Sequence, residues 1–434
     1  MRKVVNVGLI GFGTVGGGVY NLLRHNHDII LSRSDIDIRL KTICDLDTAK
    51  VLSQTTGVAV TSDYNDIIND GEIGIVVELI GGFEPAKSII METLRRKKHV
   101  VTANKKLLAE RGDDIFALSH RSTCKLGFEA SVGGGIPCVM ALRSGLIGNR
   151  VKSVMGILNG TTNYILTRMQ DEGLSFDDAL KDAQRRGFAE ADPTFDIEGY
   201  DAGHKIAILS MLAYNKRIDY SAISIEGITG IGELDIAYAR EMGYVIKLLG
   251  ISKHAGGSVD IRVHPTMLPL THPLASVRNE FNAIMFNNDM TGPVTLYGRG
   301  AGANPTASAV VSDIVQIAKK EHVEDSAIRI SGDAVYVSPE GRLSRYYLRV
   351  HTEDSPGILA AIAGVLAKYK ISIASVIQKE SDKSHVPLVI MTHEAYEAGM
   401  LDAVREMNNF SFVNGTVRLI RVEDDYIDGE GNER

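Results

Sequence analysis

Residues 4–16 read VVNVGLIGFGTVG, and this stretch decides the fold of the first part of the chain. An apolar, β-branched run leads into the spacing G-x-G-x-x-G, with glycines at Gly11, Gly13 and Gly16, and an apolar helical pattern follows. The first glycine permits a tight turn, the second lets backbone approach a pyrophosphate, and the third allows close packing of helix on strand. The pattern predicts a strand, a loop and a helix whose N-terminus binds the phosphates of a dinucleotide.

The remainder of the first 130 residues alternates apolar strands with helical patterns. Further strands are expected at residues 36–43, 73–80 and 99–102, and a helix at residues 85–97. This alternation predicts an α/β domain with a Rossmann-like, doubly wound parallel sheet that binds ligands beyond the carboxyl ends of its strands. Lys105 follows a strand end and is a candidate site residue, whereas its neighbour Lys106 is expected at the surface.

The end of the second strand bears on the form of the dinucleotide. Asp45 can hydrogen-bond the ribose hydroxyls of an unphosphorylated cofactor, although it lies further from the glycines than the usual ~20 residues. A polar insertion at residues 25–35 accounts for the longer spacing. Lys50 and Arg39 are the cations near in sequence that could receive a 2′-phosphate. The choice between NAD and NADP stays open, with a slight preference for NAD.

A second stretch carries the candidate chemistry. Residues 187–214 read GFAEADPTFDIEGYDAGHKIAILSMLAY, an acidic, turn-rich segment that becomes an apolar helix. Asp201 and Lys205 share one helix face, and apolar side chains continue that face, so it is expected to point inward. A carboxylate and an ammonium at the dry end of a helix suit proton transfer on a small polar substrate. The alternative is a solvated surface pair, worth about 0.3–0.5 kcal/mol.

A glycine-rich segment at residues 128–137, FEASVGGGIP, has two interpretations. Composition alone favours a flexible crossing into the next domain. Alternatively, the Glu129 carboxylate and the carbonyls of Val132, Gly134 and Ile136 could form an oxygen cage for a hard cation.

Two polar loops are expected to lead into helices. A strand at residues 151–158 precedes Asn159, Thr161 and Thr162, which can cap a helix at residues 164–172.

Later strands, at residues 259–268, 283–286 and 294–297, indicate an antiparallel-leaning sheet in a second, α+β domain. The loop GRGAGANPT at residues 298–306 then precedes a helix at 307–319. A second glycine loop before a helix suggests that the chain returns to the dinucleotide, with a plain helix entry as the alternative.

Length and composition exclude several classes of protein. A chain of 434 residues is too long for one core and suggests about three domains. Its net charge of −7 gives no electrostatic footprint for nucleic acid or an anionic membrane. Three cysteines without metal-ligand spacing argue against a disulfide scaffold and a zinc site. No signal-peptide pattern or transmembrane run is visible, so a cytoplasmic protein is expected.

The last part of the chain has its own pattern. After a polar connector at 339–342, the expected order of strands and helices is βαββαβ, which indicates a ferredoxin-like fold at residues 345–424. Asp354, Ser355 and Gly357 belong to a D-x-P-G turn at a helix start, which can hold the carboxylate of an amino acid on free N–H groups. A module that only packs or dimerises is the alternative. The acidic tail at 425–434 is expected to be disordered.

Several motifs resemble one family. GFGTVG, VVTANKKLLA, FEASVGGGIP, GILNGTTNYILTRM, GFAEADPTFDIEGYDAGHKIAIL and GAGANPTASAVVSDI occur in this order over residues 5 to about 316. They resemble the bacterial homoserine dehydrogenases that carry a C-terminal regulatory module, and residues 345–424 resemble an ACT domain. The resemblance implies interconversion of L-homoserine and L-aspartate 4-semialdehyde with NAD or NADP, a step toward threonine, methionine and isoleucine.

The resemblance also assigns roles to residues. It implies that Lys205 is the general acid/base, with Lys105 close to substrate and nicotinamide. The substrate, chiefly its ammonium, would be held by acidic residues, namely Glu190, Asp196 and Asp201. A monovalent cation, normally sodium, would lie at the loop formed by Glu129, Val132, Gly134 and Ile136, which replaces the interpretation of this loop as a hinge.

The cofactor would be lined by the glycine loop and by later residues, namely Gly11, Phe12, Gly13, Thr14, Val15, Gly16, Asp45, Lys105, Gly187, Glu190 and Gly302. Many relatives carry Arg where this chain has Cys44, which weakens the case for a 2′-phosphate. L-threonine would be the logical effector at Asp354, Ser355 and Gly357.

These expectations define an organisation. We expect a dinucleotide-binding domain at 1–130 with a return helix near 300–320, a catalytic and dimerisation domain at 131–300, a linker at 321–344 and an ACT domain at 345–424. A homodimer paired through the sheet of the second domain is expected, and a tetramer is the larger option.

Two other functions fit parts of the pattern less well. An aspartate-semialdehyde dehydrogenase would need a nucleophilic cysteine in a suitable motif, and none of the three cysteines has one. An amino-acid sensor that keeps only the fold would be expected to have lost Lys205, Lys105 or Glu190, and all three are present.

Overall fold

The computed structural model describes residues 2–319, 330–379 and 385–424. The chain forms two compact units. The first unit contains residues 1–160, 201–223 and 280–334, and the second contains residues 161–200, 224–279 and 335–434. The residues expected as a catalytic domain, 131–300, are therefore shared between the two units. The expected tail, 425–434, and residues 321–329 of the expected linker lie outside the described residues.

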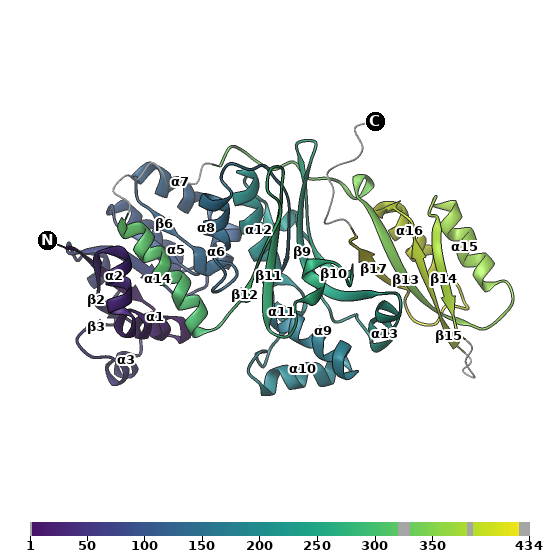
Figure 1. The fold of residues 1–434 in the computed structure, drawn as a ribbon, viewed down its shortest axis with the longest axis horizontal. Coiled ribbons are helices and arrows are strands. Elements are labelled where there is room, and N and C mark those ends of the chain that lie inside the picture. The colour runs from purple at the N-terminus through teal and green to yellow at the C-terminus, as the bar shows by residue number, and fades with distance from the viewer. Residues whose placement is uncertain (1, 320–329, 380–384, 425–434) are drawn as a thin grey trace. The chain divides into compact units, whose positions relative to one another are not determined.

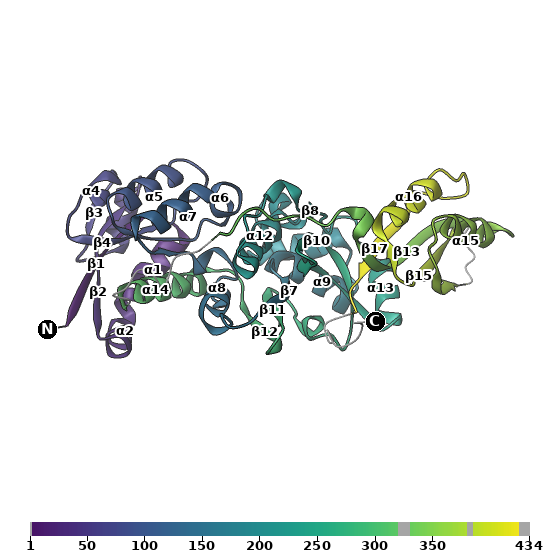
Figure 2. The same ribbon diagram turned by 90° about the horizontal axis from the view of Figure 1, so that it is seen from above.

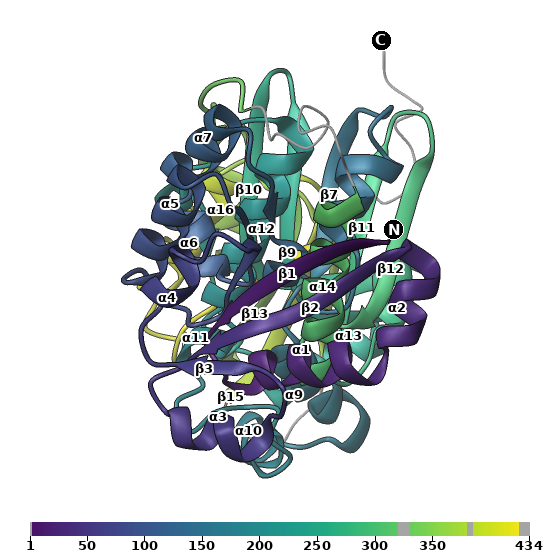
Figure 3. The same ribbon diagram turned by 90° about the vertical axis from the view of Figure 1, so that its left-hand side faces the viewer.

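The first unit contains the predicted parallel sheet. Its order is β3 (Ala59–Thr61), β2 (Ile36–Cys44), β1 (Lys3–Ile10), β4 (Ile73–Glu78), β5 (His99–Thr102) and β6 (Leu126–Gly127), and all neighbours are parallel. Figure 3 shows β3, β2 and β1 side by side. This is the doubly wound order in which ligands bind where the strand order reverses, between β1 and β4.

Helices cover both faces of this sheet. One face carries α5 (Ala86–Arg95), α6 (Lys105–Arg111) and α7 (Asp113–Ser122), and the other carries α1 (Thr14–His25), α2 (His27–Ser34) and α14 (Ala303–Lys319) (Figure 2). Short helices α3 (Thr48–Gln54) and α4 (Asn65–Ile68) complete the connections. The prediction of an α/β doubly wound sheet is confirmed.

The glycines of the first loop do what the motif requires. Gly11 has a φ of +99°, which a side chain rarely adopts, and a Cβ on Gly16 would lie 2.2 Å from the Gly11 carbonyl oxygen. Gly18 lets α14 approach α1, since a Cβ there would meet the Ala303 carbonyl oxygen at 2.8 Å. Figure 1 shows α14, in green, beside the purple α1. Helix α14 therefore packs against α1, and the return of the chain to the cofactor stays a prediction.

The first unit also holds an antiparallel strand group and the candidate helix. Its strands are β7 (Val151–Ile157), β11 (Phe281–Asn288) and β12 (Gly292–Arg299), with β11 pairing antiparallel to both others. Helix α12 (Tyr200–Tyr214) is buried over most of its length, and α8 (Cys138–Met140) follows the glycine-rich loop. The carboxyl end of β7 therefore delivers Leu158 and Asn159 to this unit's interior.

The second unit contains a larger mixed sheet and its own helices. Strand β9 (Tyr244–Ala255) pairs antiparallel with β10 (Ser258–Pro269), and short β8 (Ser224–Ile225) lies on the other edge of β10. Its first helices are α9 (Gly160–Glu172), α10 (Phe176–Arg185), α11 (Thr194–Ile197) and α13 (Glu233–Glu241). Strand β9 was not predicted from the sequence.

The end of the second unit has the predicted ferredoxin-like order. Its strands lie in the order β17 (Arg418–Val422), β13 (Leu343–Glu353), β15 (His385–Thr392) and β14 (Ile373–Gln378), with short β16 (Ala395–Tyr396) beside β13. Helices α15 (Ile358–Lys368) and α16 (Glu397–Met407) pack through one apolar core on the same face of this sheet (Figure 2). The order βαββαβ is confirmed.

Two boundaries differ from the predictions for local reasons. Helix α9 begins at Gly160, so Thr161 and Thr162 are inside the helix and do not cap it. The polar insertion at 25–35 is largely the helix α2, which is exposed and has no buried residues, so no apolar periodicity reveals it in the sequence.

Among the described residues, no helix combines the length and apolar character needed to cross a membrane.

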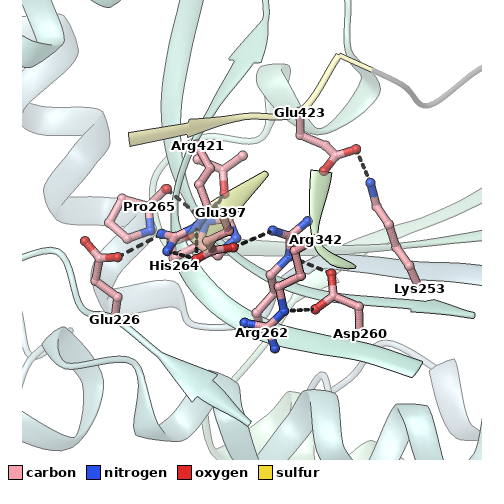
Figure 4. Close-up of polar contacts among 11 residues, drawn as sticks. Glu226, Lys253, Asp260, Arg262, His264, Pro265, Arg342, Glu397, Arg421 and Glu423 are labelled. Carbon is pink, nitrogen blue, oxygen red and sulfur yellow. Dashed lines mark hydrogen bonds and ion pairs between the residues drawn. The ribbon is translucent and has the colours of Figure 1, made fainter. Parts of the chain in front are cut away.

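A group of buried charges joins the ferredoxin-like part to β10 (Figure 4). Strand β17 pairs in parallel with β10 over only two residue pairs. Around this short pairing, Arg421 contacts Glu397 at the start of α16 and donates from Nη1 to Glu226 at 3.0 Å. Arg262 and Arg342 both pair with Asp260, at 3.1 and 2.9 Å.

Glu397 holds a central place in this group because Arg262 also lies 3.8 Å from its second oxygen. Burial alone would raise the pKa of Glu397, but Arg421 and Arg262 overcome this and lower the pKa below its usual value. Each buried charge therefore has an opposite charge in contact, as burial requires.

We predict that Glu397→Ala lowers the free energy of unfolding by about 3–5 kcal/mol, because buried arginines would lose their carboxylate. Urea unfolding measures this. Because the pKa of Glu397 is lowered on folding, its contribution is complete above the ordinary carboxyl pKa of about 4.3 and is lost as the pH falls below that value. The difference in free energy of unfolding between the wild type and Glu397→Ala should therefore become smaller as the pH falls below that value.

Glu406→Ala is the matched control, because Glu406 is on the same helix and pairs with Lys368 in a largely exposed ion pair. It should leave the unfolding curve unchanged. Equal effects of the two substitutions would contradict the assignment of stability to the buried group.

Candidate active site

Asp201 and Lys205 form a buried ion pair on α12. Lys205 Nζ donates to Asp201 Oδ2 at 2.6 Å and to the Leu158 carbonyl oxygen, also at 2.6 Å. Their side chains are only 5% and 8% exposed. The face that carries them points inward as predicted, and the alternative of a solvated surface pair is wrong.

Lys105 and Asn159 complete the surroundings of Asp201. Lys105 Nζ lies 3.1 Å from Asp201 Oδ1, and Asn159 Nδ2 donates to Asp201 Oδ2 at 2.8 Å. Burial alone would raise the pKa of Asp201, but Lys205 and Lys105 lower it well below its usual value. Asp201 is therefore a permanent carboxylate that orients two ammonium groups. The sequence indicated Asn159 as a helix cap and as a donor near a substrate carboxylate, and its bond to Asp201 depends on the tertiary fold.

The start of α6 is held by groups to which the sequence analysis assigned no role. Asn104 caps the helix by accepting from Leu107 N, and its Nδ2 donates to the Gly82 carbonyl oxygen at 2.7 Å. Thr102 Oγ1 donates at 2.6 Å to Glu78, whose other oxygen accepts from backbone N–H groups of the following turn. Burial raises the pKa of Glu78. Their position at the ends of β4 and β5 is the sequence signal that could have identified both residues.

The glycine loop fits a dinucleotide. Space in front of Gly13 is open, since a Cβ there would meet nothing within 4 Å. Asp45 Oδ2 accepts from Phe12 N at 2.6 Å, and Asp45 Oδ1 accepts from Asp47 N at 2.9 Å. Asp45 thus directly follows β2 and lies beside the glycine loop, where its carboxylate could accept hydrogen bonds from the ribose hydroxyls of a cofactor. Burial and neighbouring carboxylates raise the pKa of the Cys44 thiol to about 11.

The glycine-rich loop at 128–137 is largely buried, which does not fit a flexible crossing. The Glu129 carboxylate accepts from Val139 N and Met140 N, at 2.8 and 2.7 Å, and so caps α8. Burial raises the pKa of Glu129. Among the described residues, no group of three or more acidic, histidine or cysteine side chains could hold a metal ion. Any cation at this loop would therefore depend on main-chain carbonyls.

Gly187, Glu190 and Asp196 belong to the second unit. Asp196 Oδ2 accepts from Thr161 Oγ1 at 3.1 Å, and Gln184 Nε2 donates to the Glu190 carbonyl oxygen at 3.1 Å. The Glu190 side chain is on an exposed residue. The structure brings Lys105, Asp201 and Lys205 together, and these acidic residues precede Asp201 on the same segment of chain.

The turn expected to bind an effector is exposed. Gly357 has a φ of +92° and directly precedes α15, and Asp354 Oδ1 accepts from Gln378 Nε2 at 3.2 Å. Ser355 is also exposed.

Comparisons with known proteins identify the family. Residues 137–315 match the homoserine dehydrogenase family, and residues 11–129 match the NAD-binding domain of homoserine dehydrogenase. Residues 346–410 match the ACT domain. A homoserine dehydrogenase of Neisseria gonorrhoeae is 44% identical over 431 residues, which cover 97% of this chain and 99% of that protein. The chain belongs to the homoserine dehydrogenase family.

Solved structures of homoserine dehydrogenases agree with this. The enzyme from Thiobacillus denitrificans superimposes with a TM-score of 0.92 at 42% identity, over 97% of this chain and 99% of that one. The S. aureus homoserine dehydrogenase gives a TM-score of 0.76 at 34% identity, over 98% and 100% of the two chains. The family is one of NAD(P)-dependent oxidoreductases that act on a CH–OH group, so the aspartate-semialdehyde dehydrogenase and sensor alternatives are excluded.

The buried ion pair between Asp201 and Lys205 leads us to a prediction for the variant Asp201→Asn. The variant should lose about 3–5 kcal/mol in the free energy of unfolding, because the Lys205 ammonium would be buried without a carboxylate. The pKa of Asp201 is lowered on folding, so its contribution is complete above the ordinary Asp pKa of about 3.9 and is lost as the pH falls below it. Urea unfolding at several pH values measures both effects.

The control is Glu92→Gln. Glu92 also pairs across one helix turn, with Arg96 at 2.9 Å, but that pair is exposed. Glu92→Gln should unfold like the wild type. If the free energy of unfolding of Asp201→Asn were also unchanged, the stabilising role of the buried pair would be contradicted.

Proposed function

We propose that Lys205 is the general acid/base in the interconversion of L-homoserine and L-aspartate 4-semialdehyde. The observation that supports this most is the buried contact of Lys205 with Asp201 and Leu158, which uses two of the three N–H groups of its ammonium. The third N–H remains to face a substrate oxygen. Lys105, on the other oxygen of Asp201, places a second cation near the same point.

The proton transfer follows from this geometry. The nicotinamide cofactor, when bound, supplies the chemistry of removing hydride from C4 of homoserine or returning it. In the reducing direction Lys205 donates its third proton to the oxygen that becomes the C4 hydroxyl. In the oxidising direction neutral Lys205 removes that proton, and Asp201 keeps the amine in place. Lys105 stabilises negative charge on the same oxygen.

We predict that Lys205→Ala lowers kcat by about 10²–10⁴-fold, the usual contribution of a general acid/base, while NADH affinity is retained. Steady-state kinetics and fluorescence titration with NADH separate the two effects. Lys181→Ala, which removes a largely exposed lysine, is the control and should have wild-type kcat. Wild-type turnover of Lys205→Ala would refute the role.

The substrate ammonium is proposed to bind the acidic residues that precede α12. Glu190 and Asp196 supply the carboxylates, and Asp201 contributes the negative charge at the helix start. Gly187 and Gly302, with φ of +76° and +113°, form turns beside this segment and at the entry to α14. They are proposed to complete the cofactor pocket.

NAD is proposed as the preferred cofactor. Asp45 accepts from the glycine loop, and the end of β2 also carries Asp47, so a 2′-phosphate would meet negative charge. Cys44 supplies no cation. A mutant of a hyperthermophilic archaeal homoserine dehydrogenase, 27% identical and covering 73% of this chain, was solved in complex with NADPH, and we do not extend that ligand to this chain.

A sodium ion is proposed at the loop formed by Glu129, Val132, Gly134 and Ile136, with the Glu129 carboxylate and the main-chain carbonyls of the other three as ligands. The loop is buried and lies close to the entry of α14, since a Cβ on Gly134 would meet the Gly300 carbonyl oxygen at 2.6 Å. Its carbonyls are thus fixed on a rigid loop, as an oxygen-ligated cation needs.

L-threonine is proposed as the effector at Asp354, Ser355 and Gly357. The ACT match and the free N–H groups at the start of α15 support this. A cytoplasmic homodimer is proposed as the working form.

One assay tests these proposals. Absorbance of reduced nicotinamide is followed with L-homoserine and either NAD or NADP, with and without L-threonine, and with sodium replaced by choline at equal ionic strength. We expect homoserine-dependent reduction, faster with NAD, slower with threonine and slower without sodium. No change in absorbance with either cofactor, in either direction of the reaction, would refute the activity. A faster rate with NADP would refute the proposed preference for NAD. An unchanged rate with threonine or without sodium would refute the proposed effector or the proposed cation.

A further inference from the structure

We propose that Glu110 and His204 form a positioning contact that holds α6, and with it Lys105, against α12. The proposal rests on the proposed function of Lys105 and Lys205. It concerns two residues to which the sequence analysis assigned no role: Glu110, which directly follows the motif VVTANKKLLA, and His204, which precedes Lys205.

Two contacts join the same pair of helices. At their starts, Lys105 Nζ lies 3.1 Å from Asp201 Oδ1. Further along, His204 Nε2 lies 2.7 Å from Glu110 Oε1. Glu110 follows Lys105 by five residues, about 7.5 Å along a helix, so the contacts are well separated on α6. Two separated contacts fix both the distance of α6 from α12 and its rotation, which one contact cannot do.

His204 is a rigid anchor for this contact. Its side chain is 2% exposed, and its ring stacks on Tyr220 with centroids 4.3 Å apart and planes 8° from parallel. Burial lowers the pKa of His204, and Glu110 partly offsets this. Asp201 and Lys105 are the other charges that act on the ring. The imidazole is therefore neutral near pH 7, and Nε2 donates because a carboxylate can only accept.

The need for such an anchor follows from the exposure of Lys105. The Lys105 side chain is 36% exposed, against 8% for Lys205, so packing restricts it much less. Helix α6 has only seven residues, too few to be stable alone. Asn104 fixes its first turn, and Glu110 fixes its last. A rotation of α6 would move Lys105 off Asp201, and displacements of about 1 Å can cost about 10²-fold in rate.

The alternative is that His204 only fills the core. In that case the fold would need the His204 ring and its stacking on Tyr220, but it would not need the Glu110 carboxylate, whose side chain is 27% exposed. The two roles therefore predict different results for changes at Glu110.

The first experiment compares Glu110→Ala, Glu110→Gln and Asp114→Ala in the full-length enzyme. We expect kcat of Glu110→Ala to fall about tenfold, because Lys105 loses its position. NADH affinity should change much less, because the glycine loop and Asp45 are not touched. Glu110→Gln should recover most of the rate, since its amide oxygen still accepts from Nε2. Asp114 is on the neighbouring helix α7, and its exposed carboxylate pairs with Lys87 of α5. Asp114→Ala should therefore keep wild-type kcat.

The second experiment adds His204→Phe, which keeps a stacking ring and removes the donor. If the pair acts as a unit, the double variant with Glu110→Ala is no slower than either single variant. Hydrogen exchange of residues 105–111 should accelerate in Glu110→Ala and not in Asp114→Ala. This readout needs no turnover, so it tests the contact even if the wild type fails to oxidise homoserine.

Two results would overturn the proposal. One is wild-type kcat and hydrogen exchange in Glu110→Ala. The other is a double variant whose losses multiply, which would mean that Glu110 and His204 act independently.

Discussion

The site of this homoserine dehydrogenase depends on one buried carboxylate, Asp201. Two ammonium groups and an amide converge on its oxygens, from Lys105, Lys205 and Asn159. A buried carboxylate is costly without such partners, and the buried Lys205 would be equally costly without the carboxylate. This mutual requirement brings together the end of β7, the start of α6 and the start of α12. Lys205 is held by Asp201 and the Leu158 carbonyl oxygen together, so its ammonium is fixed in one place.

The second unit uses the same principle for a different purpose. Its ferredoxin-like part meets β10 through only two parallel residue pairs, too few to specify an orientation by hydrogen bonds alone. Buried arginines and carboxylates around Glu397 surround this short pairing (Figure 4). Because an unpaired buried charge is penalised, an orientation that separated these pairs would be disfavoured. The ACT part is thus joined to β10 by charge as well as by strand pairing.

The candidate site is supported by contacts between groups that are distant in the sequence. Glu78 and Thr102 are ordinary strand-end residues in the sequence, and their hydrogen bond exists only because β4 and β5 are neighbours. Glu110 and His204 are 94 residues apart and meet because α12 packs beside α6. Propensity and periodicity describe neighbours in sequence, so such contacts could not be predicted from them.

The sequence by itself determined the doubly wound sheet, the glycine loop, the βαββαβ order and the inward face of α12. The glycine loop and the inward face follow from spacing within one short segment, and the two strand orders follow from the sequence of such segments along the chain. Only the tertiary structure decided that Lys105 and Asn159 share Asp201 with Lys205, that Asp45 binds the glycine loop, and that the loop at 128–137 is buried. These outcomes depend on which distant segments pack together, because burial and charge pairing are properties of the folded interior.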